Sequence, residues 1–125
     1  MKYTNILLID DDIDDQEIFG EALARISQEV NFTAMSNAKD ALRQLVGKVI
    51  SPDAIFLDLN MPIMNGEEFL KLIKMDEELK HIPVIIFSTS ANPATIADLK
   101  NTGAVDFITK PGSFSTLIEV LTPFF

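Results

Sequence analysis

Short apolar runs alternate with helix-type patterns along the chain, and this alternation limits the fold more than any other feature of the sequence. Runs of strand type occupy residues 5–10, 31–36, 53–58, 83–88 and 104–109. The first, third and fourth runs are almost continuously apolar, as expected for central strands that are covered on both faces. Strands that alternate with helices predict an α/β fold, with a parallel sheet, right-handed crossovers and helices on both sides.

The segments between the strand-type runs have the spacing of amphipathic helices. Apolar residues recur at i, i+3, i+4 and i+7 within residues 19–30, 38–46, 69–73, 96–103 and 114–121. Gly47 and Gly103 stand where glycines commonly end helices. Asn65-Gly66 indicates a turn that opens the third helix.

The overall composition excludes several classes of site and partner. The chain has 125 residues, a length typical of one domain, and a formal net charge of −9. So much negative charge argues against nucleic acids and membranes as partners. The absence of cysteine excludes disulfides and thiolate ligands, and the single histidine, His81, argues against a zinc site. Because the N-terminus lacks a signal peptide and no apolar run could span a bilayer, a cytoplasmic protein is expected.

Polar side chains follow four of the predicted strands. Asp10 and Asp11 come after the first strand and Asp58 after the third, while Ser88 ends the fourth and Lys110 the fifth. In parallel α/β sheets, ligands bind beyond the carboxyl ends of the strands, at the point where the strand order reverses. We therefore expect these five side chains to converge on one edge of the sheet.

This set of side chains is suited to phosphoryl transfer. Three carboxylates with backbone oxygens are typical ligands of Mg²⁺, and the cation would offset the repulsion within the acidic run 10–15. Asp58 would act as a nucleophile toward a phosphoryl group, since its carboxylate is already ionised at neutral pH. Lys110 would neutralise phosphoryl oxygens while Ser88 donates a hydrogen bond to them, and the product would be an aspartyl phosphate.

The order and spacing of these residues resemble the receiver domain of two-component response regulators, of the stand-alone chemotaxis type. The resemblance rests on Asp10-Asp11 after "ILLI", Asp58 in "DLNMPIMNG", Ser88 after "PVIIF", and Lys110-Pro111. It extends over residues 4–122. It implies a flavodoxin-like (βα)5 doubly wound fold with strand order 2-1-3-4-5, and a single receiver domain over residues 1–125 without an output domain.

The resemblance also implies a role for each site residue. Asp58 would be the phosphoacceptor, and Asp11 and Asp58 would ligate Mg²⁺ directly. The backbone carbonyl of Asn60 would be a third protein ligand, with Asp10 acting mostly through water. Ser88 and Phe107 would form the switch pair, in which the hydroxyl turns toward the phosphoryl group and the ring moves inward.

Three further details concern the end of the fourth and fifth strands. The resemblance implies a cis peptide bond between Lys110 and Pro111. The residue after the switch hydroxyl, usually alanine or glycine, is Thr89, which would narrow access to the phosphoryl group. The switch aromatic is Phe107 rather than the frequent tyrosine, so it has no hydroxyl to offer a partner.

The predicted function is a binding module that phosphorylation controls. A histidine kinase or phosphotransfer protein would donate the phosphoryl group, and the domain would catalyse only its own phosphorylation and dephosphorylation. By the same resemblance, output would pass to another protein through the face formed by helix 4, strand 5 and helix 5, residues 93–121. The resemblance implies the same face as the contact surface if the domain forms a homodimer.

The acidic run 10–15 can also be compared with a helix start and with a calcium-binding loop. Asp12 is expected to be a helix N-cap, and Asp14 and Asp15 to complement the helix dipole. An EF-hand calcium loop would need glycine at its sixth position, where Asp15 stands.

Three other functions compete with the phosphorylation switch. A haloacid-dehalogenase-like phosphatase would need an acid at the position of Asn60. A flavodoxin would bind FMN phosphate where the aspartates repel it. A scaffold that is never phosphorylated is the remaining alternative, for which Thr89 is the one argument.

Overall fold

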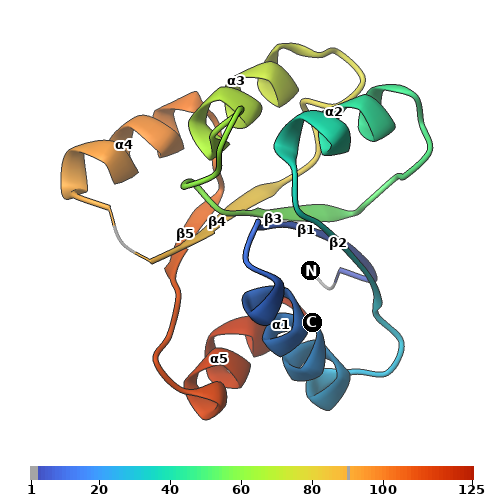
Figure 1. The fold of residues 1–125 in the computed structure, drawn as a ribbon, viewed down its shortest axis with the longest axis vertical. Coiled ribbons are helices and arrows are strands. Elements are labelled where there is room, and N and C mark those ends of the chain that lie inside the picture. The colour runs from blue at the N-terminus through green and yellow to red at the C-terminus, as the bar shows by residue number, and fades with distance from the viewer. Residues whose placement is uncertain (1–2, 90) are drawn as a thin grey trace.

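The computed structural model describes residues 3–89 and 91–125. The strands β1 (Asn5–Ile9), β2 (Asn31–Met35), β3 (Ala54–Leu57), β4 (Val84–Ser88) and β5 (Asp106–Thr109) are parallel and lie in the order β2-β1-β3-β4-β5. Helices α1 (Ile13–Ile26) and α5 (Phe114–Leu121) cover one face of the sheet, and α2 (Ala38–Val46), α3 (Gly66–Met75) and α4 (Pro93–Thr102) cover the other (Figure 1). The predicted flavodoxin-like fold is confirmed.

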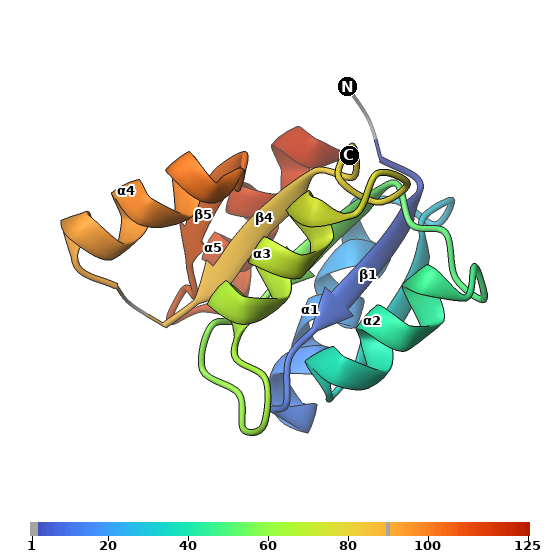
Figure 2. The same ribbon diagram turned by 90° about the horizontal axis from the view of Figure 1, so that it is seen from above.

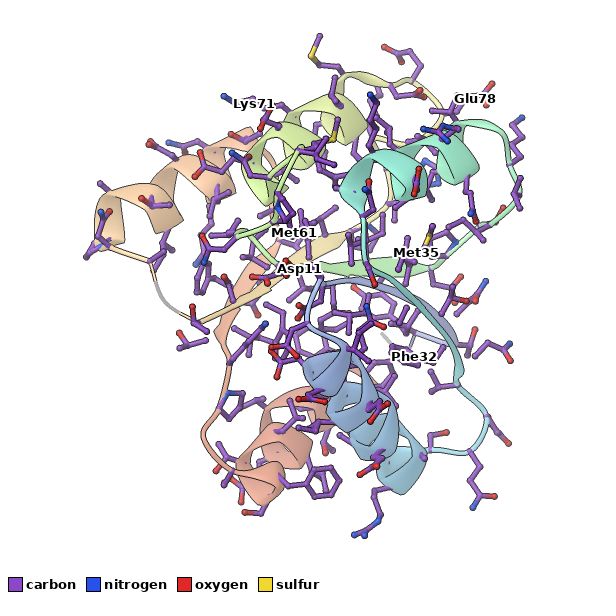
Figure 3. The ribbon with its side chains drawn as sticks, in the orientation of Figure 1. Asp11, Phe32, Met35, Met61, Lys71 and Glu78 are labelled. Carbon is purple, nitrogen blue, oxygen red and sulfur yellow. The ribbon has the colours of Figure 1, made fainter. Side chains whose placement is uncertain are left out.

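The sheet separates two apolar cores, because successive side chains of a strand point to opposite faces. On β1, Leu7 and Ile9 belong to the core under α2, α3 and α4, while Ile6 and Leu8 belong to the core under α1 and α5. Every residue of β3 and β4 is buried, as their continuous apolar runs predicted. Side chains fill the space on both sides of the sheet, and charged groups such as Lys71 and Glu78 lie at the surface (Figure 3).

The second core is rich in phenylalanine. The ring of Phe19 on α1 lies 5.6 Å from Phe32, 5.1 Å from Phe56 and 5.3 Å from Phe87, measured between centroids. Phe125, after the short 3-10 helix η1 (Thr122–Phe124), is buried in the same core and stacks on Phe56. The two ends of the described chain are joined, since the backbone N–H of Tyr3 donates to the carbonyl of Phe124.

Helices α2, α3 and α4 lie side by side across their face of the sheet (Figure 2). Asn65 caps α3 in a capping box with Glu68, and Gly66 is the first residue of the helix. A Cβ atom at Gly66 would stand 2.4 Å from the carbonyl oxygen of Asp58, so only glycine allows this approach. The start of α3 is thereby held against the end of β3.

The first helix differs from its predicted limits. α1 ends at Ile26, so Val30 lies outside it, and the helix begins at Ile13, within the acidic run. Asp12 is the N-cap, as predicted, because its carboxylate accepts from the backbone N–H of Asp15. Within the described residues, no helix has the length and apolar character needed to cross a bilayer.

Candidate functional site

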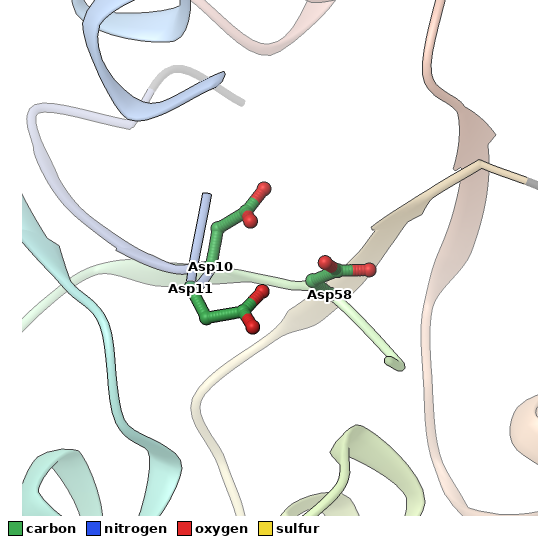
Figure 4. Close-up of side chains that lie close together, drawn as sticks. All are labelled: Asp10, Asp11 and Asp58. Carbon is green, nitrogen blue, oxygen red and sulfur yellow. The ribbon is translucent and has the colours of Figure 1, made fainter. Parts of the chain in front are cut away.

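Three carboxylates meet beyond the carboxyl ends of β1 and β3. Asp10 and Asp11 follow β1, and Asp58 follows β3. The strands β1 and β3 are direct neighbours in the sheet. Carboxylate oxygens of all three residues lie within 4.8 Å of one another (Figure 4). Asp10 and Asp58 are buried, whereas Asp11 is exposed. The sheet thus brings together acids that are far apart in the sequence.

Lys110 places its ammonium against this acidic group. Its Nζ atom lies 2.8 Å from Oδ2 of Asp10, 2.8 Å from Oδ2 of Asp15 and 3.4 Å from Oδ2 of Asp58. The lysine side chain is only 12% exposed. A single ammonium therefore has three carboxylate neighbours, one from each of three segments of the chain.

The expected cis bond after Lys110 is absent. The described residues contain no cis peptide, so the prediction for Lys110-Pro111 is wrong. The backbone N–H of Lys110 donates to the carbonyl of Ser88 at 2.8 Å, which continues the pairing of β5 with β4. This hydrogen bond places the backbone of Lys110 beside the site. Its long side chain reaches Asp10, Asp15 and Asp58 although the Lys110-Pro111 bond is trans.

Ser88 orients the carboxylate of Asp58. Its buried hydroxyl donates to Oδ1 of Asp58 at 2.7 Å, and the backbone N–H of Leu59 donates to the same oxygen at 2.8 Å. The other carboxylate oxygen, Oδ2, is the one that faces Lys110. Asp58 is therefore held on one side and directed on the other toward a cationic group.

Burial changes the electrostatics of Asp10. Removal of this carboxyl from water raises its pKa from 3.8 to about 6, a change that the nearby charge of Asp58 reinforces. The ammonium of Lys110 and the backbone N–H of Asp12 act in the opposite direction. Burial also lowers the pKa of Lys110, but its contacts with Asp10 and Asp15 outweigh this, so the lysine pKa lies above its ordinary value.

The acidic group fits a divalent cation. Oδ2 of Asp10 is buried without a hydrogen-bond partner in the part of the chain that the structure describes, although Nζ of Lys110 lies 2.8 Å away. Of the three carboxylates, Asp10 and Asp58 lie against the single ammonium of Lys110, and Asp11 adds a third negative charge, which leaves excess negative charge at the site. An all-oxygen donor set of this kind suits a hard cation such as Mg²⁺.

The two predicted switch residues lie on neighbouring strands and share one face of the sheet. Ile86 pairs with Phe107, and Ser88 pairs with Thr109, so Phe107 is one step along the same face from Ser88. Phe107 is half-buried and packs against the core beneath α3 and α4.

Thr89 and Asn60, the two other residues singled out near the site, are both exposed in loops. Thr89 follows β4 directly, and Asn60 lies two residues after Asp58. The carbonyl of Asn60 as a cation ligand stays a prediction.

Two residues at the site were not predicted from the sequence. Asp15 was assigned only to the helix dipole, but its carboxylate contacts Lys110. The side-chain amide of Gln16 donates to the carbonyl of Asp10 at 2.6 Å and to the hydroxyl of Ser36 at 2.9 Å. The available signal was the helix start itself, since the first turn of a helix that follows a strand directly must lie near the end of that strand.

Comparison with known proteins assigns the family. The family model described as "Response regulator receiver domain" matches residues 6–122. The chain belongs to this family. Receiver domains are signalling switches rather than enzymes that turn over small molecules, and this match gives no support to the phosphatase and flavodoxin hypotheses.

Curated relatives come from plants and bacteria. The receiver domain is 38% identical over 114 residues to the two-component response regulator ORR1 of Oryza sativa subsp. japonica, covering 86% of this chain and 49% of the rice protein. The chain therefore spans about half the length of that relative. It is 34% identical over 114 residues to the chemotaxis protein CheY-3 of Vibrio cholerae, covering 90% of this chain and 88% of CheY-3.

Solved structures of response regulators superpose closely on the receiver domain. The phosphorylated cyanobacterial phytochrome response regulator RcpA has a TM-score of 0.86 and 32% identity, covering 97% of this chain and 90% of RcpA. The Mn²⁺-bound form of response regulator Rcp1 has a TM-score of 0.84 and 26% identity, covering 96% and 90%.

Proposed function

We propose that this receiver domain is a phosphorylation-controlled switch of a two-component system and that Asp58 is its phosphoacceptor. The observation that carries the proposal is the environment of Asp58. Ser88 and Leu59 hold one carboxylate oxygen, and the other faces the ammonium of Lys110. A carboxylate fixed in this way would be a preorganised nucleophile, and the side chains of Ser88 and Lys110 that hold it would be near enough to donate to phosphoryl oxygens.

The transfer exchanges one bond to phosphorus for another. A carboxylate oxygen of Asp58 attacks the phosphorus of a phosphohistidine, the P–N bond breaks, and the nitrogen keeps the electron pair and takes a proton from solvent. Lys110 and the Ser88 hydroxyl then donate to phosphoryl oxygens. In dephosphorylation, water attacks the phosphorus and loses a proton to solvent, the P–O bond to Asp58 breaks, its electron pair stays on the carboxylate, and inorganic phosphate leaves.

Asp10, Asp11, Asp58 and the backbone carbonyl of Asn60 are the proposed holders of Mg²⁺. The cation, when bound, would neutralise charge on the phosphoryl oxygens. Support comes from the excess of buried negative charge at this site and from the Mn²⁺-bound form of the similar regulator Rcp1.

The proposed output follows from the switch pair. When Ser88 turns from Asp58 toward the phosphoryl group, Phe107 moves inward, and the surface of α4, β5 and α5 changes. The phosphoryl donor is a histidine kinase or a phosphotransfer protein in the cytoplasm. The partner that reads the surface is another protein or a second copy of this domain.

The test is incubation with Mg²⁺ and acetyl phosphate, followed by intact mass spectrometry. Asp98 is exposed on α4 and serves as the control. Wild type and Asp98→Asn should each gain the mass of one phosphoryl group. The gain should disappear in Asp58→Asn and when a chelator is added. A persistent gain in Asp58→Asn, or none in wild type, contradicts the proposal.

A further inference from the structure

The ammonium of Lys110 is held by an acid outside the three-carboxylate group. Asp10 and Asp58, two of its three neighbours, belong to the proposed cation site. The third neighbour, Asp15, lies on the first turn of α1, and its Oδ2 atom is 2.8 Å from Nζ. Lys110 donates hydrogen bonds to Asp15 and Asp58 and forms an ion pair with Asp10.

Asp15 closes the site toward solvent. Its side chain is 34% exposed, whereas that of Asp10 is fully buried and that of Asp58 is 8% exposed. The ammonium therefore has the two buried acids on its inner side and Asp15 on its outer side. A lysine side chain is long and flexible, and without Asp15 its outer donor would turn to water.

The backbone around Asp15 is fixed by local hydrogen bonds. Its N–H donates to the carboxylate of the N-cap Asp12 at 3.1 Å. The next residue, Gln16, donates its side-chain amide to the carbonyl of Asp10. The first turn of α1 is thus tied to the end of β1, and the carboxylate of Asp15 is preorganised over the site.

We propose that Asp15 is a positioning residue for phosphoryl transfer, which holds the ammonium of Lys110 over Asp58. The proposal rests on the proposed function, because it concerns the same reaction. When Asp10 and Asp58 turn their oxygens to a cation and a phosphoryl group, Asp15 is the neighbour that still holds Lys110. Its loss leaves the ammonium fewer contacts and a smaller fraction of time in reach of the phosphoryl oxygens.

The test compares phosphorylation rates of Asp15→Asn and Asp14→Asn with acetyl phosphate and Mg²⁺, followed by intact mass. Asp14 is the matched control, because it lies beside Asp15 on the same helical turn, is exposed, and is not among the three carboxylate neighbours of Lys110. Both changes remove one negative charge from the start of α1. We expect the phosphorylation rate of Asp15→Asn to be lower than that of Asp14→Asn by a factor of about three or more.

A double-mutant cycle separates positioning from a structural effect. In a Lys110→Met background, Asp15→Asn should cause no further loss of rate, since no ammonium is left to position. Asp15→Glu, which keeps the carboxylate, should recover part of the rate. Thermal unfolding of each variant checks that the fold is retained.

Two results overturn the proposal on Asp15. One is an Asp15→Asn rate equal to or above that of Asp14→Asn, and the other is an equal loss with and without Lys110. In both cases wild type still takes up phosphate, so the proposed function survives. If wild type and Asp14→Asn both fail to gain phosphate, the proposed function itself fails.

Discussion

At the scale of single residues, the site combines a buried acid that is hard to ionise with a buried acid that is held by two short hydrogen bonds. Asp10 is fully buried and its pKa is raised to about 6, mainly because burial removes the carboxylate from water. Asp58, also buried, has one oxygen satisfied by two donors. These two donors are the backbone N–H of Leu59, in the loop after β3, and the hydroxyl of Ser88, at the end of β4.

The raised pKa of Asp10 predicts a pH-dependent stability. The folded value, about 6, lies above the unfolded value of 3.8, so the folded state binds this proton more tightly. The unfavourable contribution of Asp10 therefore appears as pH rises from about 4 to about 6. Without divalent cations, Asp10→Asn should gain stability over wild type as pH rises through this window, by on the order of 2–3 kcal/mol.

Urea unfolding at several pH values, in the presence of a chelator, measures this effect. Asp14→Asn serves as the control for removing one charge from the same segment, and its difference from wild type should vary less with pH. An Asp10→Asn advantage that stays constant or shrinks as pH rises would show that burial is not the dominant cause.

At the scale of elements, the loop after β3 and the start of α3 are in direct contact. A Cβ at Gly66 would stand 2.4 Å from the carbonyl oxygen of Asp58 and 2.9 Å from Cα of Leu59. Both neighbours are backbone atoms and cannot move aside as a flexible side chain can. The carboxylate of Asp58 is thus placed by helix packing as well as by its own strand.

Gly66→Ala should therefore destabilise the fold and slow phosphorylation together. Overpacking against backbone costs about 1–3 kcal/mol, and a shift of the Asp58 loop would disturb the geometry for attack. Gly112→Ala is the control, because a Cβ there meets nothing within 4 Å. Urea unfolding and the acetyl phosphate assay measure the two effects, and unchanged values for Gly66→Ala would refute the role of this contact.

At the scale of the whole molecule, the sheet order decides where the charges gather. β1 and β3 are neighbours, and α1 follows β1 closely, so acids from two strand ends and one helix start surround the same ammonium. The excess negative charge opposes folding, and a bound cation should relieve it.

Mg²⁺ should accordingly stabilise the folded domain. A ligand at about 100 times its dissociation constant contributes roughly 2.7 kcal/mol when it binds only the folded state. The midpoint of thermal unfolding should rise with Mg²⁺ concentration in wild type and in Asp14→Asn, and much less in Asp11→Asn. Equal shifts in all three proteins would place the cation elsewhere.

The sequence by itself determined the elements and the main site residues. Strand-type runs of apolar residues and helical spacing are local properties, and they predicted each strand to within about two residues. Asp58, Ser88 and Lys110 could be found because the carboxyl ends of parallel strands always share one edge of the sheet. That rule needs no knowledge of how the helices pack.

The tertiary structure alone decided how the side chains meet. The contact between Asp15 and Lys110 depends on how α1 and β5 are placed against each other, and the contacts of Gln16 depend on how α1 lies against the ends of β1 and β2. No local pattern encodes such a distance, because residues 15 and 110 are separated by most of the chain. Packing sets it, and with it the raised pKa of Asp10 and the direction in which Lys110 points.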